Sequence, residues 1–348
     1  MRNLLLSLIL IFVSVGTIQA QWLPDSLLHG FSYRIVPQPD DYQGSVVSTV
    51  IRKDTVMTSR KGVLYVHGFN DYFFQEAMAD SITAHGWKFM AVDLRRYGRS
   101  LREGDKRFDV RSLSSYYQDI DSGVVALQNA GVDTVVIVGH STGGLITSMY
   151  MNEVHPQVVK GLILNSPFLD WNMSGFVEKI AIPVVTWLGK FFPNIKISQG
   201  KSTYYGESLL NTAKGEWAFD TSKKLLQSPP VTAGWIRAIT MGQRYLHKHS
   251  DIKVPILLMH SSRTINGRDR GDGDAVLDVK DIAKWGMQLG PNVTEVTVDG
   301  AFHDMVLSPL VVRDEVYHDM FEWLDKIFES SPQPTVNQTS SCGTQSSL

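Results

Sequence analysis

The chain has 348 residues, of which 43% are hydrophobic and 20% are charged. These values are typical of a soluble globular protein and exclude a disordered, collagen-like or multi-spanning membrane chain. The 33 basic and 35 acidic side chains leave a net charge of -2, so the composition gives no sign of a nucleic-acid-binding surface. The single cysteine, Cys342, excludes an internal disulfide and a cysteine-based zinc site.

The first twenty residues have the pattern of a secretory signal peptide. A short cationic start is followed by an apolar run from Leu4 to Val15, and Ala20 offers a small residue at the cleavage position. We therefore expect cleavage between Ala20 and Gln21 and a secreted or periplasmic location. An uncleaved N-terminal membrane anchor is the alternative, although this apolar run is shorter than the roughly 20 residues that span a bilayer.

The rest of the chain alternates between short apolar strands and longer helical stretches. Two β-rich runs at 33–36 and 45–51 come first. We then expect strands at 63–66, 88–92, 134–138, 159–164, 255–259 and 294–298, and helices at 74–85, 110–130, 143–154, 279–289 and 311–328. Strands rich in Val, Ile and Leu that alternate with helices predict an α/β fold, with a mostly parallel sheet covered by helices on both faces.

Two segments depart from this alternation. Residues from about 170 to 250 carry four tryptophans and several other aromatic side chains without a strand–helix rhythm, which predicts a mostly helical insertion. Residues 331–348 are rich in Ser, Thr, Gln and Pro, which predicts a disordered tail. We therefore expect one domain over residues 21–330 with an insertion, rather than two domains in series.

One short motif carries most of the chemical information. Residues 139–143 read Gly-His-Ser-Thr-Gly, a G-x-S-x-G pattern between a predicted strand and a predicted helix. A turn this tight strains the backbone at Ser141 and needs small flanking residues, because larger side chains would clash there. The hydroxyl of Ser141 would then stand clear of the sheet as a nucleophile. The alternative is an ordinary glycine-rich turn in which the serine caps the helix.

A serine hydroxyl becomes a good nucleophile only when a base removes its proton. His303 is our candidate base, because it lies in the loop between the last predicted strand and the last predicted helix. His67, His140 and His260 are the alternatives, and each follows or ends an earlier strand.

The base in turn needs a carboxylate that fixes its tautomer. In chain order, this acid should follow the strand at 255–259 and precede His303. Asp274, which lies just before a predicted helix, is our candidate, and Asp278 is the alternative. The remaining aspartates of this stretch are interpreted as solvated or helix-capping residues: Asp269, Asp272 and Asp281.

An oxyanion formed at the carbonyl needs backbone N–H donors that already point at it. One should come from Thr142, the residue after the serine. The other should come from Phe69, in the loop after the strand at 63–66. Simple packing is the alternative role for Phe69.

Together these segments resemble the α/β-hydrolase family, and within it the group of lysophospholipases, monoacylglycerol lipases and serine aminopeptidases. The resemblance spans residues 45 to 328 and rests on His-Gly-Phe at 67–69, Asp-Leu-Arg-Arg-Tyr-Gly-Arg-Ser at 93–100, the motif at 139–144, and the late Asp274 and His303. Arg96 stands where that group usually has a glycine. The loop between the strand ending at His260 and Asp274 is also longer than the usual link.

The resemblance implies acyl transfer to water without a metal or cofactor. Ser141 would attack a carbonyl, His303 would move the proton, and the amides of Phe69 and Thr142 would hold the oxyanion. The insertion lies where family members carry a lid over the active site. Its aromatic side chains would then either receive an acyl chain or form the insertion's own core.

Three functions remain open, in this order. The first is a secreted hydrolase of monoacylglycerols, lysophospholipids or smaller carboxylic esters, with transient contact to a lipid surface. The second is a serine aminopeptidase, in which carboxylates of the insertion would hold a substrate ammonium, and the third is a non-catalytic binding protein. The acidic candidates of the insertion are Glu207, Glu216 and Asp220.

Three arginines are candidates for contact with an anionic headgroup. Arg95, Arg96 and Arg99 lie close together in the segment at 93–100. The alternative is that they form ion pairs at the surface.

Overall fold

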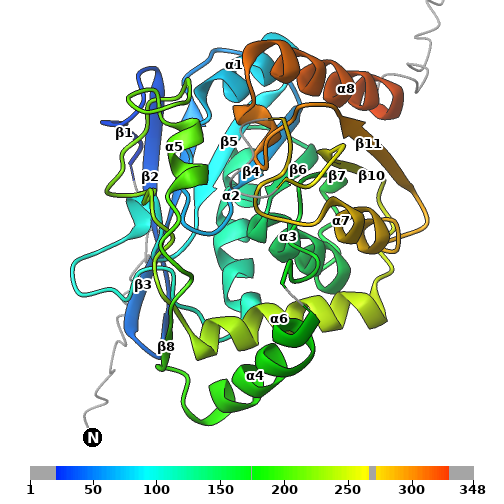
Figure 1. Cartoon of the computed structure of the whole chain (residues 1–348). Coiled ribbons are helices and arrows are strands. Elements are labelled where there is room, and N and C mark those ends of the chain that lie inside the picture. The colour runs from blue at the N-terminus through cyan, green and yellow to red at the C-terminus, as the bar shows by residue number, and fades with distance from the viewer. Residues whose placement is uncertain (1–20, 174, 266–271, 329–348) are drawn as a thin grey trace, which may run out of the picture.

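The computed structural model describes residues 21–173, 175–265 and 272–328, so the predicted signal peptide and the predicted tail at 331–348 lie outside the described residues. Nine strands form one sheet in the order β1-β2-β3-β5-β4-β6-β7-β10-β11 (Figure 1). Along this order, each strand from β1 as far as β5 pairs antiparallel with its neighbour. From β5 through β4 to β11, the neighbouring strands pair parallel. The strands are β1 (Leu23–Pro24), β2 (Phe31–Asp41), β3 (Gly44–Lys53), β4 (Lys61–Val66), β5 (Lys88–Asp93), β6 (Thr134–His140), β7 (Val159–Asn165), β10 (Ile256–Ser261) and β11 (Val293–Val298).

Helices cover both faces of this sheet, and the predicted fold class is confirmed. Leu64 and Val66 of β4 face one core, whereas Val63 and Tyr65 face the other. Successive side chains of a strand point to opposite faces, so burial of both faces explains why these strands are apolar throughout. One core is completed by α1 (Glu76–Ala84) and α8 (Leu310–Phe328), and the other by α2 (Tyr117–Asn129), α3 (Thr142–Glu153), α6 (Ala233–His249) and α7 (Val279–Gly286).

The stretch at 110–130 differs from the single helix predicted there. A 3₁₀ turn at Leu113–Tyr116 precedes α2, and Ser112 before it has extended backbone angles. Val110 and Leu113 are both buried, so their spacing of three residues mimics a helical pattern. The apolar pattern therefore shows which side chains reach the core, but it does not show where the helix begins.

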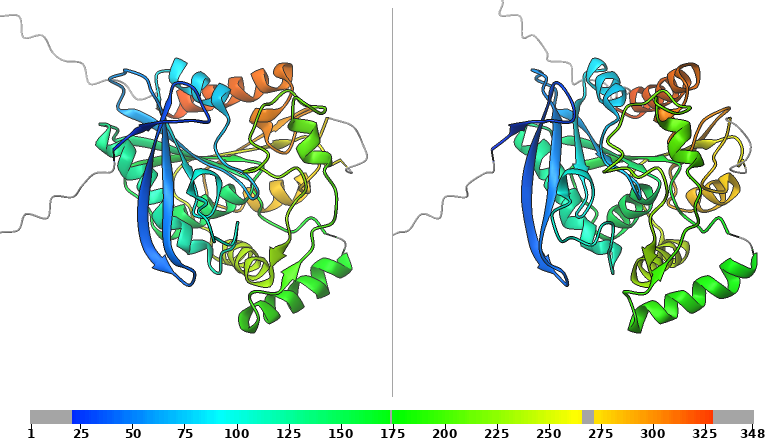
Figure 2. Two further views of the ribbon diagram at one scale, coloured as in Figure 1. Left: turned by 90° about the vertical axis from the view of Figure 1, so that its left-hand side faces the viewer. Right: turned by 60° about the vertical axis from the view of Figure 1, so that its left-hand side comes forward.

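The segment between β7 and β10 adds helices and a small second sheet. It contains α4 (Ile182–Phe191), α5 (Tyr204–Leu209) and α6, with β8 (Lys196–Ile197) paired antiparallel to β9 (Val231–Thr232). Helix α4 packs along α6 at the edge of the molecule (Figure 2). Among the described helices, none is both long enough and apolar enough to cross a membrane.

A buried ion pair joins α2 to the end of β5. The carboxylate of Asp119 accepts hydrogen bonds from the backbone N–H of Arg95 at 2.9 Å and from its Nη2 at 2.7 Å, and both side chains are buried. Asp119→Ala would leave the guanidinium buried without a counter-charge. We expect this substitution to lower the free energy of unfolding by about 3–5 kcal/mol, measured by urea denaturation at pH 7.

The exposed pair between Arg60 and Asp133 provides the matched control for this prediction. Solvent screens an exposed pair, so Asp133→Ala is expected to cost less than about 1 kcal/mol. Equal losses of unfolding free energy in the two variants would show that the buried pair stabilises the fold no more than the exposed pair does.

Candidate active site

Ser141 lies in the tight turn between β6 and α3. Its backbone has φ 52° and ψ −118°, a strained conformation for a residue with a side chain. A Cβ atom on Gly139 would lie 2.3 Å from Oγ1 of Thr147, and one on Gly143 would lie 2.4 Å from the carbonyl oxygens of Val66 and His67. Both glycines are therefore needed for close packing of this turn.

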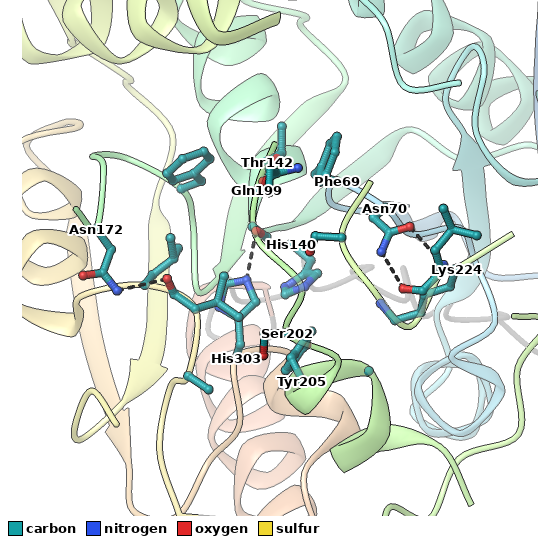
Figure 3. A pocket seen from close by; sticks show the side chains of 18 of the residues that line it. Phe69, Asn70, His140, Thr142, Asn172, Gln199, Ser202, Tyr205, Lys224 and His303 are labelled. Atoms are coloured by element: carbon teal, nitrogen blue, oxygen red, sulfur yellow. Dashed lines mark hydrogen bonds between the residues drawn. The ribbon is translucent and has the colours of Figure 1, made fainter. Parts of the chain in front are cut away.

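A chain of two hydrogen bonds joins Ser141, His303 and Asp274. Nε2 of His303 lies 2.9 Å from Oγ of Ser141, and Nδ1 lies 2.8 Å from Oδ2 of Asp274 (Figure 3 shows the first bond). A carboxylate only accepts, so Nδ1 carries the hydrogen and the lone pair of Nε2 faces the serine hydroxyl. Since all three side chains are buried, the arrangement can take the proton of Ser141 and hold the resulting imidazolium beside a carboxylate.

The structure separates the two candidate acids by what each carboxylate binds. Oδ1 of Asp274 accepts from the backbone N–H groups of Val276 and Leu277 at 2.7 and 2.8 Å, which leaves Oδ2 for His303. Asp278 instead caps α7, where its side chain accepts from the N–H of Lys280. Asp272 pairs with Arg263 at the surface, and Asp269 lies outside the described residues.

The loop after β4 passes directly against Ser141. A Cβ atom on Gly68 would lie 3.0 Å from Cβ of Ser141, and Phe69 and Thr142 both line the pocket around the serine. Neither the Phe69 nor the Thr142 amide donates a hydrogen bond to another described residue. Both amides are thus free to receive an oxygen atom at this end of the sheet.

The other candidate histidines have structural partners. His67 donates from Nδ1 to the carbonyl of Gly68 and accepts at Nε2 from the N–H of Leu94. His140 donates from Nδ1 to the carbonyl of Asn165, and burial lowers the pKa of its imidazole, so the ring is neutral at pH 7. His260 hydrogen-bonds Ser261 and Glu295. Of the four histidines, His303 alone hydrogen-bonds Ser141.

Ser141 and His303 open into a pocket of about 310 Å³, near the lower end of the range for small-molecule sites. Part of the lining, which we call the aromatic wall, consists of rings in contact at centroid distances from 4.7 to 6.3 Å. Its members are Phe69, Phe168, Trp171 and Trp235. Another part of the lining, which we call the polar wall, carries amide, hydroxyl and ammonium groups (Figure 3). Its members are Asn70, Gln199, Ser202, Tyr205, Lys224 and Ser228.

Sequence reasoning missed the polar wall. Lys224 and Tyr205 come from the insertion and have no motif around them. The hydroxyl of Tyr205 accepts from the N–H of Asp304 at 3.1 Å, and burial raises its pKa well above the usual range, so it stays a neutral phenol. The side chain of Asn70 binds both the N–H and the carbonyl of Leu225, which fastens the insertion to the loop that carries Phe69.

The arginines suggested for an anionic headgroup do not line this pocket. All three side chains are buried and form ion pairs elsewhere. Arg95 pairs with Asp119, Arg96 pairs with Asp41, and Arg99 pairs with both Asp25 and Asp93. The expectation of surface pairs is therefore wrong as well, because distant carboxylates cover these side chains. Arg96, with φ 65°, reaches the hairpin formed by β2 and β3.

The carboxylates suggested for a substrate ammonium are also absent from the pocket lining. Glu207 pairs with Lys214, Asp220 pairs with Lys223, and Glu216 is exposed. Among the described residues that line the pocket, none is an aspartate or a glutamate. The described part of the lining therefore offers no carboxylate on which to seat a free amino terminus.

Within the part of the chain that the structure describes, two groups of side chains have a spacing that could hold a metal ion. The buried group, Asp71, His140 and Asp304, lies beside the pocket. Asp71 already pairs with the ammonium of Lys224, and Asp304 accepts from two side-chain amides, so the chain's own donors satisfy most of these carboxylate oxygens. The second group is on α8, away from the pocket, and two of its three side chains are exposed.

Gly143→Ala is expected to impair both folding and the site. The added methyl group would meet the backbone oxygens of Val66 and His67 at 2.4 Å, and backbone atoms there cannot move without shifting β4 and the Phe69 loop. We expect a loss of about 1–3 kcal/mol in unfolding free energy, measured by urea denaturation. Gly175→Ala is the control, because a Cβ atom there meets nothing within 4 Å. Equal stability of the two variants would contradict this account of the turn.

Comparison with known proteins identifies the family of this chain and agrees with its fold. Residues 58–307 match the family model described as serine aminopeptidase, S33. "Phospholipase YtpA" of Bacillus subtilis is 22% identical over 260 residues, which cover 73% of this chain and 91% of that protein. Two solved structures share the fold. A soluble variant of monoglyceride lipase from Saccharomyces cerevisiae has a TM-score of 0.60 and 18% identity, and the match covers 84% of this chain and 96% of that one. The monoacylglycerol lipase of Paleococcus ferrophilus has a TM-score of 0.58 and 19% identity, and the match covers 78% of this chain and 96% of that one. Because the family match covers well over half of the chain, the protein belongs to the serine aminopeptidase S33 family and is a hydrolase with the α/β-hydrolase fold.

Proposed function

We propose that the protein is a secreted serine hydrolase that cleaves carboxylic esters of the lysophospholipid, monoacylglycerol or smaller ester type. The observation that carries this proposal is the hydrogen-bonded chain from Ser141 through His303 to Asp274, which opens onto a pocket with an aromatic wall. The pattern of residues 1–20 supports secretion.

The proposed reaction proceeds in two halves through an acyl-enzyme. Oγ of Ser141 attacks the ester carbonyl while Nε2 of His303 takes the hydroxyl proton. The tetrahedral oxyanion accepts hydrogen bonds from the amides of Phe69 and Thr142, and the C–O bond breaks as His303 gives its proton to the leaving alcohol. Water then attacks the acyl-serine with His303 as base, which releases the acid and restores the serine hydroxyl.

An ester fits the pocket better than a peptide amino terminus. An aminopeptidase needs a carboxylate near the scissile bond to hold the substrate ammonium, and the described lining residues include no carboxylate but one lysine. The aromatic wall offers an apolar surface for an acyl chain. The peptidase is therefore the second candidate function, and it is retained because the matching family model is described as serine aminopeptidase.

A fluorophosphonate probe and a substrate panel test this proposal. The protein over residues 21–348 should be labelled at Ser141, and the Ser141→Ala variant should not. We expect turnover of acyl esters and little turnover of aminoacyl amides. Absence of labelling would refute both enzymatic functions, whereas amide turnover without ester turnover would favour the peptidase.

The exposed face of the insertion supports contact with a lipid surface. Five apolar side chains spaced three or four residues apart are between 51% and 70% exposed: Phe176, Ile180, Val184, Trp187 and Phe191. This spacing places them near one face of the helical stretch at residues 175–191, which ends with α4. Lys179 and Lys190 lie in the same stretch and are exposed. An apolar helix face with flanking lysines is typical of helices that lie at a membrane interface.

A double substitution on this face tests the proposed lipid contact. Trp187→Ser with Phe191→Ser is expected to reduce binding to anionic phospholipid vesicles at least about tenfold, because two large apolar side chains no longer enter the interface. Vesicle co-sedimentation measures this. Leu310→Ser with Val311→Ser, an exposed apolar pair on α8, is the matched control. Equal vesicle binding by the two double variants would exclude α4 as the contact.

A further inference from the structure

Lys224 is the one lysine among the described residues that line the proposed substrate pocket. It lines the pocket together with Ser141 and His303, and the described lining residues include no carboxylate. The second imidazole in the lining, that of His140, is neutral because burial lowers its pKa. Among the described lining residues, the ammonium of Lys224 is therefore the group that offers a positive charge to a substrate, and its partner Asp71 carries the opposite charge.

The position of this ammonium is fixed by contacts on several sides. Nζ of Lys224 lies 3.0 Å from Oδ1 of Asp71, and both side chains are buried. The same Nζ lies 5.8 Å from the ring centre of Tyr205 and 5.7 Å from that of Phe74. The next residue, Leu225, is held at its N–H and carbonyl by Asn70. A cation held in this way needs little reorganisation when it binds a ligand.

The hydrogen-bonding capacity of Lys224 is only partly used. An ammonium has three donors, and Asp71 accepts the one hydrogen bond that Nζ makes within the described residues. Lys224 lines the pocket whereas Asp71 does not, and two of the three ammonium donors have no acceptor among the described residues. A desolvated cation with unused donors favours an oxygen that carries negative charge.

We propose that Lys224 makes the polar wall an anion-binding subsite, so that the protein prefers carboxylic esters that also carry a phosphate or carboxylate group. The acyl chain would lie on the aromatic wall, and the charged part of the ester would lie on the polar wall, with the ester carbonyl at Ser141 between them. This inference rests on the proposed ester hydrolysis. The three arginines near residue 95 cannot serve here, because none of them lines the pocket.

Two esters with the same acyl chain test the preference. Butyryl glycerol and butyryl glycerol 3-phosphate are both monomeric in water, so the charge of a lipid surface does not enter the comparison. We expect wild type to have a higher kcat/KM for the phosphate ester. In the Lys224→Met, Asp71→Asn double variant, we expect the ratio of the two kcat/KM values to fall at least about tenfold, because a charged hydrogen bond is lost.

The double variant is chosen because Lys224→Met alone would leave Asp71 buried and unpaired. Lys223→Gln is the matched control: Lys223 is adjacent in the chain but pairs with Asp220 and does not line the pocket, so its variant should keep the wild-type ratio. An unchanged ratio in the double variant, or an equal fall in Lys223→Gln, would overturn the proposal.

A binding measurement separates failure of this inference from failure of the proposed function. Calorimetric titration of the Ser141→Ala protein with glycerol 3-phosphate, glycerate, glycerol and inorganic phosphate requires no turnover. We expect the two charged glycerol derivatives to bind at least about tenfold more tightly than glycerol, and this difference to vanish when Lys224→Met and Asp71→Asn are added. Such binding without ester turnover would refute the hydrolase and support the subsite. Lack of the difference, or equally tight binding of inorganic phosphate, would refute a subsite for the charged part of an ester.

Discussion

Ser141→Ala and His303→Ala are each expected to lower kcat for ester hydrolysis by at least about 10⁴-fold. The reason is the single hydrogen bond of 2.9 Å between Nε2 of His303 and Oγ of Ser141, through which the proton must leave before the carbonyl is attacked. Because each residue is useless without the other, the double variant should be no slower than the slower single variant. Single-turnover assays with a chromogenic butyrate ester measure all three.

Two substitutions outside the pocket serve as controls for that cycle. Ser114→Ala and His318→Ala remove an exposed serine and an exposed histidine, and both should keep wild-type kcat. Urea denaturation should show that the Ser141 and His303 variants remain folded. If the losses in the two single variants multiplied in the double variant, the residues would act independently, and the proposed proton transfer between them would be wrong.

Ser141 and His303 could be proposed from the sequence because their signals are local or ordered along the chain. A strand, a G-x-S-x-G turn and a helix follow one another directly, and the structure places Ser141 in this turn with a positive φ. His303 follows β11 and precedes α8, so chain order alone brings its loop to the same edge of the sheet. A parallel sheet gathers the ends of its strands at one edge, which makes chain order informative.

The polar wall could not be proposed, because its signal is a tertiary contact. Lys223 and Lys224 are indistinguishable in the sequence. Asp71, 153 residues away, pairs with Lys224 and lies with it in the interior, whereas Lys223 remains partly exposed beside Asp220. The arginines at 95, 96 and 99 give the opposite error. Their clustering in sequence indicates an anion site, but carboxylates far along the chain occupy all three.

For a related reason, the sequence alone does not distinguish the two candidate acids. Asp274 and Asp278 both precede α7, and both side chains accept backbone N–H groups just after them in the chain. What distinguishes them is the second carboxylate oxygen of Asp274, which lies 2.8 Å from His303. That contact depends on how the loop at 272–278 folds over the sheet, and spacing along the chain does not encode it.

Asp274→Asn is therefore expected to lower kcat by about 10³–10⁴-fold with little change in KM. An amide matches the carboxylate in shape but carries no charge, so it cannot stabilise the imidazolium that forms in the transition state. It can also present N–H to Nδ1 and so favour the wrong tautomer of His303. The measurement is steady-state hydrolysis of a butyrate ester at pH 7.

Asp278→Asn is the matched control, since it changes the same residue type at the start of the same helix. Its side chain accepts from the N–H of Lys280 at 2.9 Å, and asparagine caps helices about as well as aspartate. We therefore expect kcat to stay within about threefold of wild type and the unfolding free energy to change by less than about 1 kcal/mol. Full activity in Asp274→Asn with loss in Asp278→Asn would transfer the role of the acid to Asp278. Comparable losses in both variants, with reduced stability, would instead show that this loop acts through the fold rather than through the charge beside His303.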